Sequence, residues 1–295
     1  MKKIGKLQSQ LLNLDEGLGT AYERYVVNYL FYDLVKKYNI KTVLEFPANG
    51  ILGMPGLNSL IFAKMGCKIT LINNSKKTLK DFSKLWHAFN LNANYVQSDY
   101  KKTNLKNNSY DLVYGFCTFE HFSNPEEYIK EMVRLSKKYV LLFVQNNYNP
   151  GMYLHKLQHK INGQIWDHGE CKKMNAKTIL NYLPTLNLKI LNVSGIDMPP
   201  WPDINVKLKK SYKDYNPNKL KRQLDNRLLE KKLSDISNNK DFKGVIKLFK
   251  KWYFLIERKI PGIIKIYLAH HPYVLAIKND YENNKNKQNE YRVGR

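Results

Sequence analysis

Short apolar runs alternate with amphipathic stretches along the first two thirds of the chain. Apolar residues recur at every third or fourth position from about 20 to 38, which predicts a helix. Apolar runs of strand length follow at 41–46, 68–72, 94–97, 110–114 and 139–144, with helical patterns between them at 57–64, 76–90 and 125–135. Most of these runs lack polar–apolar alternation, so we expect strands buried on both faces of a mainly parallel sheet.

The last third adds fewer elements. It predicts a helix at 175–183, a strand at 188–193 and a final strand at 271–278. A basic helical insertion, about 206–260, separates those two strands, and the polar stretch 281–295 is expected to be disordered. We therefore predict one α/β domain over 1–280, with seven strands and a core at 40–195 and 263–279.

Composition limits the class of protein. With 43% hydrophobic residues among 295, wholesale disorder is excluded. The net charge of +24 indicates a polyanionic partner such as nucleic acid, an anionic membrane or a phosphorylated substrate. A compositional bias explains the charge equally well, because the excess is nearly all lysine and accompanies many Asn, Ile and Tyr residues. Both interpretations stay open.

Cysteine usage and hydropathy favour a cytoplasmic protein. Cys67, Cys117 and Cys171 are far apart and odd in number, so they predict neither a disulfide framework nor a metal knuckle. The start of the chain lacks the apolar core of a signal peptide, and no run approaches the roughly 18 apolar residues of a membrane span. Peripheral contact with a membrane stays open.

Several residues and short sequences, which we call the family marks, lie directly before or after predicted strands. Glu45 ends the first strand before a glycine-bearing loop, and Asp99 follows the third. The sequence Thr-Phe-Glu-His-Phe at 118–122 follows the Asp-Leu-Val strand at 111–113, and Glu-Met-Val-Arg-Leu at 131–135 precedes the fifth strand. Through these residues, the segment 42–146 resembles the class I S-adenosylmethionine-dependent methyltransferases. Within that class it is similar to the type 11 group, which includes ubiquinone-biosynthesis enzymes. Glu120-His121 is the most specific of the marks.

The resemblance implies a Rossmann-like sheet that binds S-adenosylmethionine beyond the carboxyl ends of its strands. An acidic residue after the second strand would bind the ribose hydroxyls, and one after the third would bind the adenine amine. The sulfonium is a good leaving group, so positioning of the nucleophile supplies much of the acceleration. The residues expected around the cofactor are Glu45, Phe46, Pro47, Asn49, Gly50, Gly53, Asn73, Asn74, Asp99, Tyr100, Phe116, Cys117 and Glu120.

The sequence departs from the family at two of these places. Pro47 and Asn49 occupy the first two glycine positions of the loop, which is about five residues longer than usual. Asn73 stands where the ribose-binding acid is expected, and an amide has no charge and only one acceptor oxygen. The loop either binds the cofactor in an altered way or belongs to a non-catalytic scaffold in which Phe46 or Met54 fills the cleft.

The segment at 146–171 is rich in His, Asp, Trp and Asn, and in the family this stretch commonly helps to build the acceptor pocket. His155 and His159 stand one helical turn apart, and with Asp167, His168 and Cys171 they suggest a metal site. The spacing matches no established motif, so we expect no metal. The alternatives are an acceptor pocket or plain packing. The expected acceptor contacts are His155, His159, Trp166, Asp167 and, in a proline-rich loop, Trp201. His121 or His168 is the expected base if the acceptor must lose a proton.

The insertion carries seventeen Lys or Arg against six Asp or Glu over 206–259. Its end, 245–259, mixes apolar and basic residues at helical spacing. Three roles are consistent with this pattern: a lid, a contact with an anionic membrane, or a nucleic-acid contact. No nucleic-acid-binding module appears, which makes the third less favoured. We expect a methyltransferase for a small-molecule or lipid-like acceptor; the alternative is a scaffold or a basic module that binds RNA or an anionic membrane.

Overall fold

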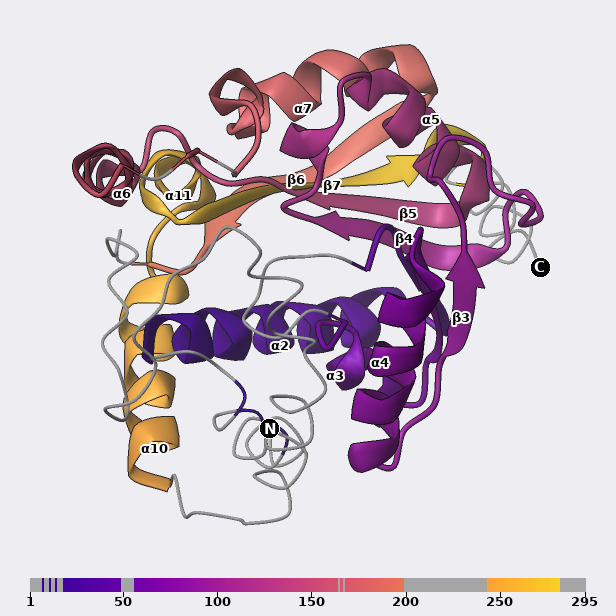
Figure 1. The fold of residues 1–295 in the computed structure, drawn as a ribbon, viewed down its shortest axis with the longest axis horizontal. Helices are drawn as coiled ribbons and strands as arrows, with labels where there is room; N and C mark the ends of the chain where they lie inside the picture. The colour runs from indigo at the N-terminus through magenta and orange to yellow at the C-terminus, as the bar shows by residue number, and fades with distance from the viewer. Residues whose placement is uncertain are drawn as a thin grey trace, which may run out of the picture.

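A computed structural model of the chain describes residues 7, 11, 14, 18–48, 56–163, 165–166, 168–198 and 243–281. Within these residues seven strands form one sheet in the order β3-β2-β1-β4-β5-β7-β6 (Figure 1). Strands β1 to β5 pair in parallel, whereas β7 runs antiparallel to both β5 and β6. The strands are β1 (Thr42–Glu45), β2 (Lys68–Asn73), β3 (Asn94–Gln97), β4 (Tyr110–Phe116), β5 (Ser136–Phe143), β6 (Leu188–Ile196) and β7 (His271–Lys278).

Helices cover both faces of the sheet (Figure 1). One face carries α2 (Leu18–Tyr38), α3 (Leu60–Lys64) and α4 (Lys76–Ala88), and the other carries α5 (Pro125–Leu135) and α7 (Ala176–Tyr182). Successive residues of each strand enter opposite layers of the core: Val43 packs toward α2, and Leu44 packs toward α5. The α/β, Rossmann-like, mainly parallel sheet predicted from the sequence is confirmed.

Local capping explains where two of these helices begin. The Ser75 hydroxyl accepts a hydrogen bond from the backbone N–H of Thr78 at the start of α4. The Asn175 side chain does the same for the backbone N–H of Thr178 at the start of α7. Each cap satisfies one of the backbone donors that a helix leaves unpaired in its first turn. Strand β2 therefore passes directly into α4, which fixes the chain around Asn73 and Asn74.

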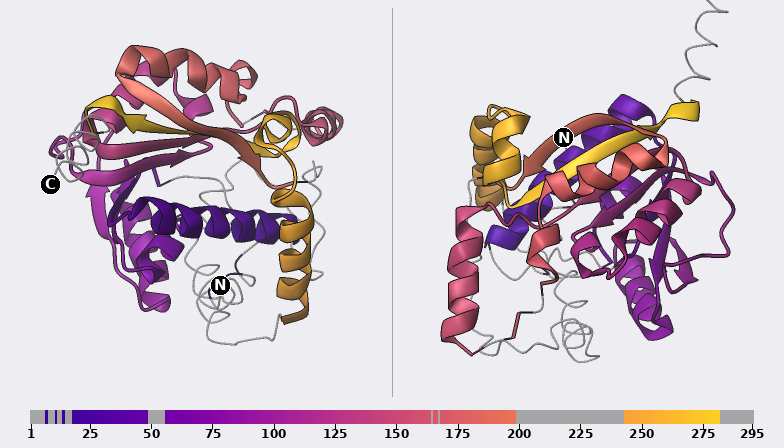
Figure 2. Two further views of the ribbon diagram at one scale, coloured as in Figure 1. Left: turned by 180° about the vertical axis from the view of Figure 1, so that it is seen from behind. Right: turned by 90° about the horizontal axis from the view of Figure 1, so that it is seen from above.

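Two further helices lie at the end of the sheet where β5 finishes and β7 begins (Figures 1 and 2). They are α6 (Pro150–Ile161) and α11 (Gly262–Leu268). The Asn149 side chain, just before α6, donates a hydrogen bond of 2.9 Å to the carbonyl of Leu268 in α11. Short helical turns occur at η1 (Phe119–His121), η2 (Cys171–Lys173) and η3 (Leu183–Leu186). The sequence analysis did not delimit α6 as a separate helix.

The final part of the basic insertion packs on the domain. It forms α10 (Lys243–Trp252) and η4 (Tyr253–Glu257), which contact α2 through an aromatic seam. The ring centroids of Tyr22 and Phe249 are 5.4 Å apart, and those of Tyr29 and Tyr253 are stacked at 4.4 Å. This packing agrees with the lid or packing interpretation of 245–259. Residues 206–242 of the insertion and 282–295 of the tail lie outside the described residues.

Two properties bear on the remaining expectations. Cys67 and Cys117 are buried and Cys171 is half-buried, and all three are free thiols. Within the described part of the chain, no helix has both the length and the apolar character needed to cross a bilayer.

Candidate active site

The loops after β2 and β3 are joined at the carboxyl edge of the sheet. The backbone N–H of Asn74 donates to the Tyr100 hydroxyl at 2.7 Å, and the Gln97 side chain donates to the carbonyl of Asn74 at 3.1 Å. Asn73 is buried, and its side-chain oxygen accepts from the backbone N–H of Ser75 at 2.8 Å. Asn74 is exposed, so the amide that faces solvent after β2 is that of Asn74.

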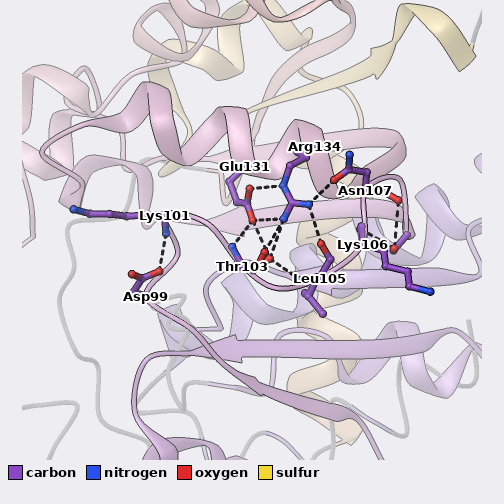
Figure 3. Close-up of polar contacts among 9 residues, drawn as sticks. Asp99, Lys101, Thr103, Leu105, Lys106, Asn107, Glu131 and Arg134 are labelled. Atoms are coloured by element: carbon purple, nitrogen blue, oxygen red, sulfur yellow. Dashed lines mark hydrogen bonds and ion pairs between the residues drawn. The ribbon is translucent and has the colours of Figure 1, made fainter.

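Asp99 is exposed on the loop that follows β3. One of its carboxylate oxygens accepts from the backbone N–H of Lys101 at 3.2 Å (Figure 3). The loop is held from α5, because Glu131 accepts from the backbone N–H of Thr103 at 2.7 Å and Arg134 donates to the carbonyl of Thr103 at 3.0 Å (Figure 3). The second carboxylate oxygen of Asp99 is therefore presented to solvent on a fixed backbone.

The ion pair between Glu131 and Arg134 holds that loop by its backbone. Burial raises the pKa of Glu131, but hydrogen bonds from Arg134 and Thr103 outweigh it and leave the pKa below its usual value. Arg134 also donates to the carbonyl of Leu105 at 2.8 Å. A guanidinium can hold several acceptors in fixed directions at once, as it does here (Figure 3). The residues 131–135 quoted for the family resemblance thus fix the loop that carries Asp99.

Glu45, at the end of β1, lies completely buried. Its carboxylate accepts from Ser59 at 2.6 Å and from Asn58 at 3.2 Å. Burial raises its pKa, although hydrogen bonds from Ser59, Tyr114 and Asn58 oppose the rise. Glu45 therefore ties the chain just before α3 to the end of β1. The contact between Glu45 and the cofactor stays a prediction. The loop residues Asn49, Gly50, Gly53 and Met54 lie outside the described residues.

Four aromatic rings cluster over the ends of β1 and β4. Phe46, next to Pro47, is fully buried and stacks on Tyr128 with the ring centroids 5.4 Å apart. Phe122 stacks on Tyr128 at 4.4 Å, and Tyr100 makes edge contacts of 6.0 Å with Phe46 and 6.1 Å with Phe122. The Tyr128 hydroxyl donates to the carbonyl of Phe46 at 2.6 Å. This aromatic cluster, Phe46, Tyr100, Phe122 and Tyr128, belongs to the core layer next to α5.

Glu120 is the buried carboxyl with the most distinctive chemistry. One oxygen accepts from the backbone N–H of Gln145 at 3.1 Å, and the other has no hydrogen-bond partner among the described residues. Burial raises its pKa to about 7, against the opposing backbone hydrogen bonds. A carboxyl group with a pKa near neutrality and a free oxygen fits the role of a general base.

Glu120 lines an open hollow of about 410 Å³. The other lining residues are His121, Phe122, Ser123, Trp166, Gly169, Glu170 and Lys173. Gly169 has φ +94°, and a β-carbon there would lie 2.8 Å from the carbonyl oxygen of Glu120. The backbone N–H of Glu170 donates to that same oxygen at 2.9 Å. The loop after α6 therefore closes tightly over Glu120 and forms one wall of the hollow.

The predicted acceptor residues fall into two places. His121 is exposed and Trp166 half-buried, and both line the hollow. His155, His159 and His168 form a separate group: the Nε2 atom of His168 lies 2.9 Å from that of His155 and 3.3 Å from that of His159. The Trp166 ring packs on all three imidazoles, with centroids 4.8 to 5.9 Å away. Asp167 and Trp201 lie outside the described residues.

Phe116 and Cys117, both predicted near the cofactor, are buried on the α2 side of the sheet. The Cys117 sulfur lies 3.0 Å from Nδ1 of His271 at the start of β7. The Nε2 atom of His271 lies 2.5 Å from a carboxylate oxygen of Glu23 in α2. Next to it, Nδ1 of His270 lies 3.2 Å from the Asp197 carboxylate.

This buried polar group has no signature in the sequence, because its members come from distant parts of the chain and no local spacing connects them. Burial raises the pKa of Asp197. It also raises the pKa of Glu257, in η4, to about 8. The Glu257 carboxylate accepts a hydrogen bond from the backbone N–H of Met198. These contacts fasten the end of the basic insertion to the loop after β6.

Comparison with known proteins identifies the class of this domain. Residues 52–144 match a family described as "Methyltransferase domain". No curated protein matches the chain. The marks at Asp99, Glu120-His121 and 131–135 fall within the matched segment. Residues 52–144 therefore carry a methyltransferase domain, which supports the enzyme class and the cofactor predicted from the sequence.

Solved structures with a similar fold include three S-adenosylmethionine-related enzymes. One is a methyltransferase from Aquifex aeolicus, with 18% identity over 66% of this chain and 92% of that one, and a TM-score of 0.42. Another is the magnesium protoporphyrin IX methyltransferase from Synechocystis with bound SAH, with 15% identity, coverage of 59% and 77%, and a TM-score of 0.44. The third is a methyltransferase from Clostridium acetobutylicum, with 13% identity, coverage of 62% and 85%, and a TM-score of 0.45.

Proposed function

We propose that this methyltransferase acts on a lipid-like acceptor that it meets at an anionic membrane surface. The observation that carries the proposal is an apolar surface formed by α6, α11 and adjoining residues, which we call the α6–α11 face. Its large hydrophobic side chains are between 44% and 80% exposed: Tyr148, Tyr153, Leu154, Leu157, Ile161, Ile165, Ile263, Ile264 and Tyr267. Scattered exposed apolar residues are normal, but a contiguous set of this kind marks an interaction surface.

The two helices form one continuous surface. The rings of Tyr148 and Tyr267 are 5.6 Å apart. The Asn146 side chain donates to the carbonyl oxygens of Ile266 and Ala269, at 3.2 and 2.7 Å. Both helices lie at the same end of the molecule in two views (Figures 1 and 2). The apolar side chains of α6 and α11 are thus held together by buried polar contacts beneath them.

Charge favours an anionic bilayer as the surface that this face meets. Lys160 is exposed on α6 among the apolar residues, and the whole chain has a net charge of +24. Apolar side chains that enter the lipid boundary beside lysines directed at anionic head groups are typical of interfacial helices. For nucleic acid the described residues offer no recognised binding module to accompany the charge.

The hollow lies next to this face. Ile165, 80% exposed, is adjacent to Trp166, and Trp166 lines the hollow. Trp166 also packs on His155 and His159, which belong to α6. An acceptor with a lipid tail could therefore keep the tail at the membrane while its polar head enters the hollow beside Glu120.

The residues at the carboxyl edge fit S-adenosylmethionine. The exposed Asp99 carboxylate would accept from the adenine amine, and the exposed Asn74 amide would bind the ribose hydroxyls. When bound, the cofactor supplies an activated methyl group on its sulfonium. Glu120 would take the proton of the acceptor as its nucleophilic atom attacks, because a carboxyl group with a pKa of about 7 is substantially ionised at neutral pH.

Sedimentation with vesicles tests the membrane step. We expect the protein to pellet with vesicles that contain anionic phospholipid, and to do so less with neutral vesicles. The double variant Leu157→Ser/Ile161→Ser should bind at least ~10-fold more weakly, because burying one such side chain is worth about 1.5–3 kcal/mol. The matched control is Ile190→Ser, on the 40% exposed Ile190 of β6, which should bind as the wild type does.

Transfer of radioactive methyl groups tests the acceptor class. With labelled S-adenosylmethionine and a total lipid extract, we expect label in the organic phase, and less of it with the double variant. Label that appears only with water-soluble acceptors would contradict the lipid proposal while leaving the methyltransferase assignment intact. Equal vesicle binding by the wild type and the double variant would remove the α6–α11 face from the proposal.

A further inference from the structure

The Nε2 atom of His168 lies close to those of both His155 and His159. His168 Nε2 lies 2.9 Å from His155 Nε2 and 3.3 Å from His159 Nε2, and one ligand nitrogen from each imidazole lies within 4.8 Å of the others. We propose that these three histidines bind a zinc ion, which joins α6 to the loop that forms the wall of the hollow. The site departs from the expectation of no metal drawn from the sequence.

The local structure explains how the three ligands meet. His155 and His159 are four residues apart on α6, so their side chains leave the same face of the helix one turn apart. The chain then turns back after α6 and brings His168 against that face. Ligands at 2.0–2.1 Å in tetrahedral coordination place neighbouring nitrogens about 3.3–3.4 Å apart. The separation of 3.3 Å between His159 and His168 matches that value, and 2.9 Å for His155 needs only a small adjustment.

The protons and lone pairs available on the three imidazoles favour a cation between them. A ring nitrogen carries either one proton or one lone pair, so His168 Nε2 cannot form ordinary hydrogen bonds of both kinds with His155 and His159. If all three nitrogens are unprotonated, their lone pairs repel unless something between them accepts all three. A zinc ion does this, because it binds neutral imidazole nitrogen and releases any competing proton.

The surroundings suit zinc rather than calcium or magnesium. The ligand set within the described residues is three imidazoles, without carboxylates, which favours zinc and other imidazole-binding transition metals over oxygen-binding ions. His159 is 4% exposed, and the Trp166 ring shields the group. Three protein ligands leave a fourth position for water or for a substrate atom.

The ion would stabilise the wall of the hollow whatever the acceptor is. His168 is adjacent to Gly169, whose tight approach to Glu120 closes that wall. Trp166, which lines the hollow, is held by a hydrogen bond of 2.8 Å from its ring N–H to the Gly169 carbonyl. The zinc proposal therefore does not depend on the lipid acceptor, and its test needs no activity measurement.

Cobalt and zinc titrations of the full chain test the site. After removal of metals with a chelator, we expect one Co²⁺ per chain, with the intense visible absorption of tetrahedral cobalt, and displacement by one equivalent of Zn²⁺. The variants His159→Gln and His168→Gln should lose more than ~10–100-fold in cobalt affinity. That range is the cost of removing a residue that only orients a metal ligand, whereas these variants remove a ligand itself. Cobalt should also quench fluorescence in the wild type more than in Trp166→Phe, which retains the three ligands.

Two histidine variants serve as matched controls. His87 is exposed on α4, so His87→Gln should leave cobalt affinity unchanged. His270 belongs to the group with Glu23 and His271, which also has the composition of a metal site. Loss of binding in His270→Gln with full binding in His159→Gln would move the metal there and overturn the proposal. Absence of cobalt binding by the wild type at millimolar metal would also overturn it.

Hydrogen exchange covers the case in which a ligand variant fails to fold. In the wild-type chain, zinc should slow the exchange of backbone amides in α6 and at 168–170 and leave those of α4 unchanged. Exchange in α6 and at 168–170 that zinc leaves unaltered would overturn the proposal without any variant.

Discussion

The sulfur of Cys117 lies 3.0 Å from Nδ1 of His271, the distance of a nucleophile from its general base. The environment does not suit that chemistry. Burial raises the pKa of the Cys117 thiol, and the nearby carboxylates of Glu120 and Glu23 raise it further. Cys117 is also only 1% exposed. The pair therefore links the end of β4 to β7 and does not provide a reactive thiolate.

Thiol titration checks this interpretation. With a disulfide reagent at pH 8, we expect one fast-reacting thiol in the native chain, that of the half-buried Cys171. Cys117 and Cys67 should react only after unfolding, and burial raises the pKa of Cys67 to about 11. Cys171→Ser should remove the fast phase. A fast phase that persists in this variant would show that a buried thiol is accessible and activated.

Glu120 should limit stability at neutral pH. Its pKa is about 7 in the folded chain, above the usual 4.5 of a glutamate, so the folded state binds the proton more tightly. Stability from this group is therefore highest below pH 4.5 and falls as the pH rises toward 7. Glu120→Gln removes this penalty and should stabilise the protein at pH 8 by up to about 3 kcal/mol, with little change near pH 4.5. Urea unfolding at the two pH values measures the difference.

The same substitution should impair catalysis. If Glu120 takes the proton of the acceptor, the rate of methyl transfer should rise with pH through about 7 in the wild type. Glu120→Gln should lower kcat by roughly 10²–10⁴-fold, the usual contribution of a general base, and abolish that rise. Charged neighbours that face the same hollow are His121, Glu170 and Lys173, with Cys117 and Tyr128 behind Glu120.

Glu170→Gln is the matched control for both measurements. It is the same substitution in the same hollow, but Glu170 is exposed and its carboxylate pairs with Lys173 at 2.7 Å. We expect neither stabilisation at pH 8 nor loss of the pH dependence. A similar fall in kcat for both variants would assign the effect to the charge of the hollow as a whole and not to Glu120.

The parts of the structure that the sequence predicts well are those set by local pattern. The apolar run at 68–72 lies within β2, and the run at 139–144 extends one residue past the end of β5. Both runs are recognisable because a strand buried on both faces is apolar along its whole length. Asp99 and Glu120 are predicted from the family resemblance, which expects an acid after the third strand and a Glu-His pair after the fourth. Glu23 and His271 were missed because α2 and β7 meet only through tertiary packing, which no spacing along the chain encodes.

The geometry of the histidines shows a different limit. The sequence places His155 and His159 on one helical face, but it does not say where the chain returns after α6. Gly169, with φ +94°, permits the close approach that positions His168, and a lone glycine in a polar loop gives no signal of that approach. The sequence therefore predicts that two of the histidines share a helix face, but not that His168 joins them.

Asp99→Ala should weaken binding of S-adenosylmethionine and S-adenosylhomocysteine. A hydrogen bond to a charged group is worth about 1.5–3 kcal/mol, which corresponds to a loss of at least ~10-fold in affinity. Calorimetric titration of the purified chain measures it. Asp280→Ala, which removes an exposed carboxylate bonded to Asn187 at 3.1 Å, is the control and should bind normally. Unchanged affinity in Asp99→Ala would mean that the adenine lies elsewhere.

Gly169→Ala should destabilise the protein by more than the strain of a left-handed backbone alone costs. Gly163 also has positive φ, +62°, but a β-carbon there meets nothing within 4 Å, whereas at Gly169 it would lie 2.8 Å from the Glu120 carbonyl. Both variants incur about 1–2 kcal/mol for a left-handed alanine, and the contact at Gly169 should add about 1–3 kcal/mol of overpacking. Urea unfolding of the two variants isolates the second contribution. Because the clash is with the backbone carbonyl and Cγ of the residue proposed as the base, only Gly169→Ala should also slow methyl transfer. Equal destabilisation by the two substitutions would mean that the loop around Gly169 can move away from Glu120 at little cost and does not fix its position.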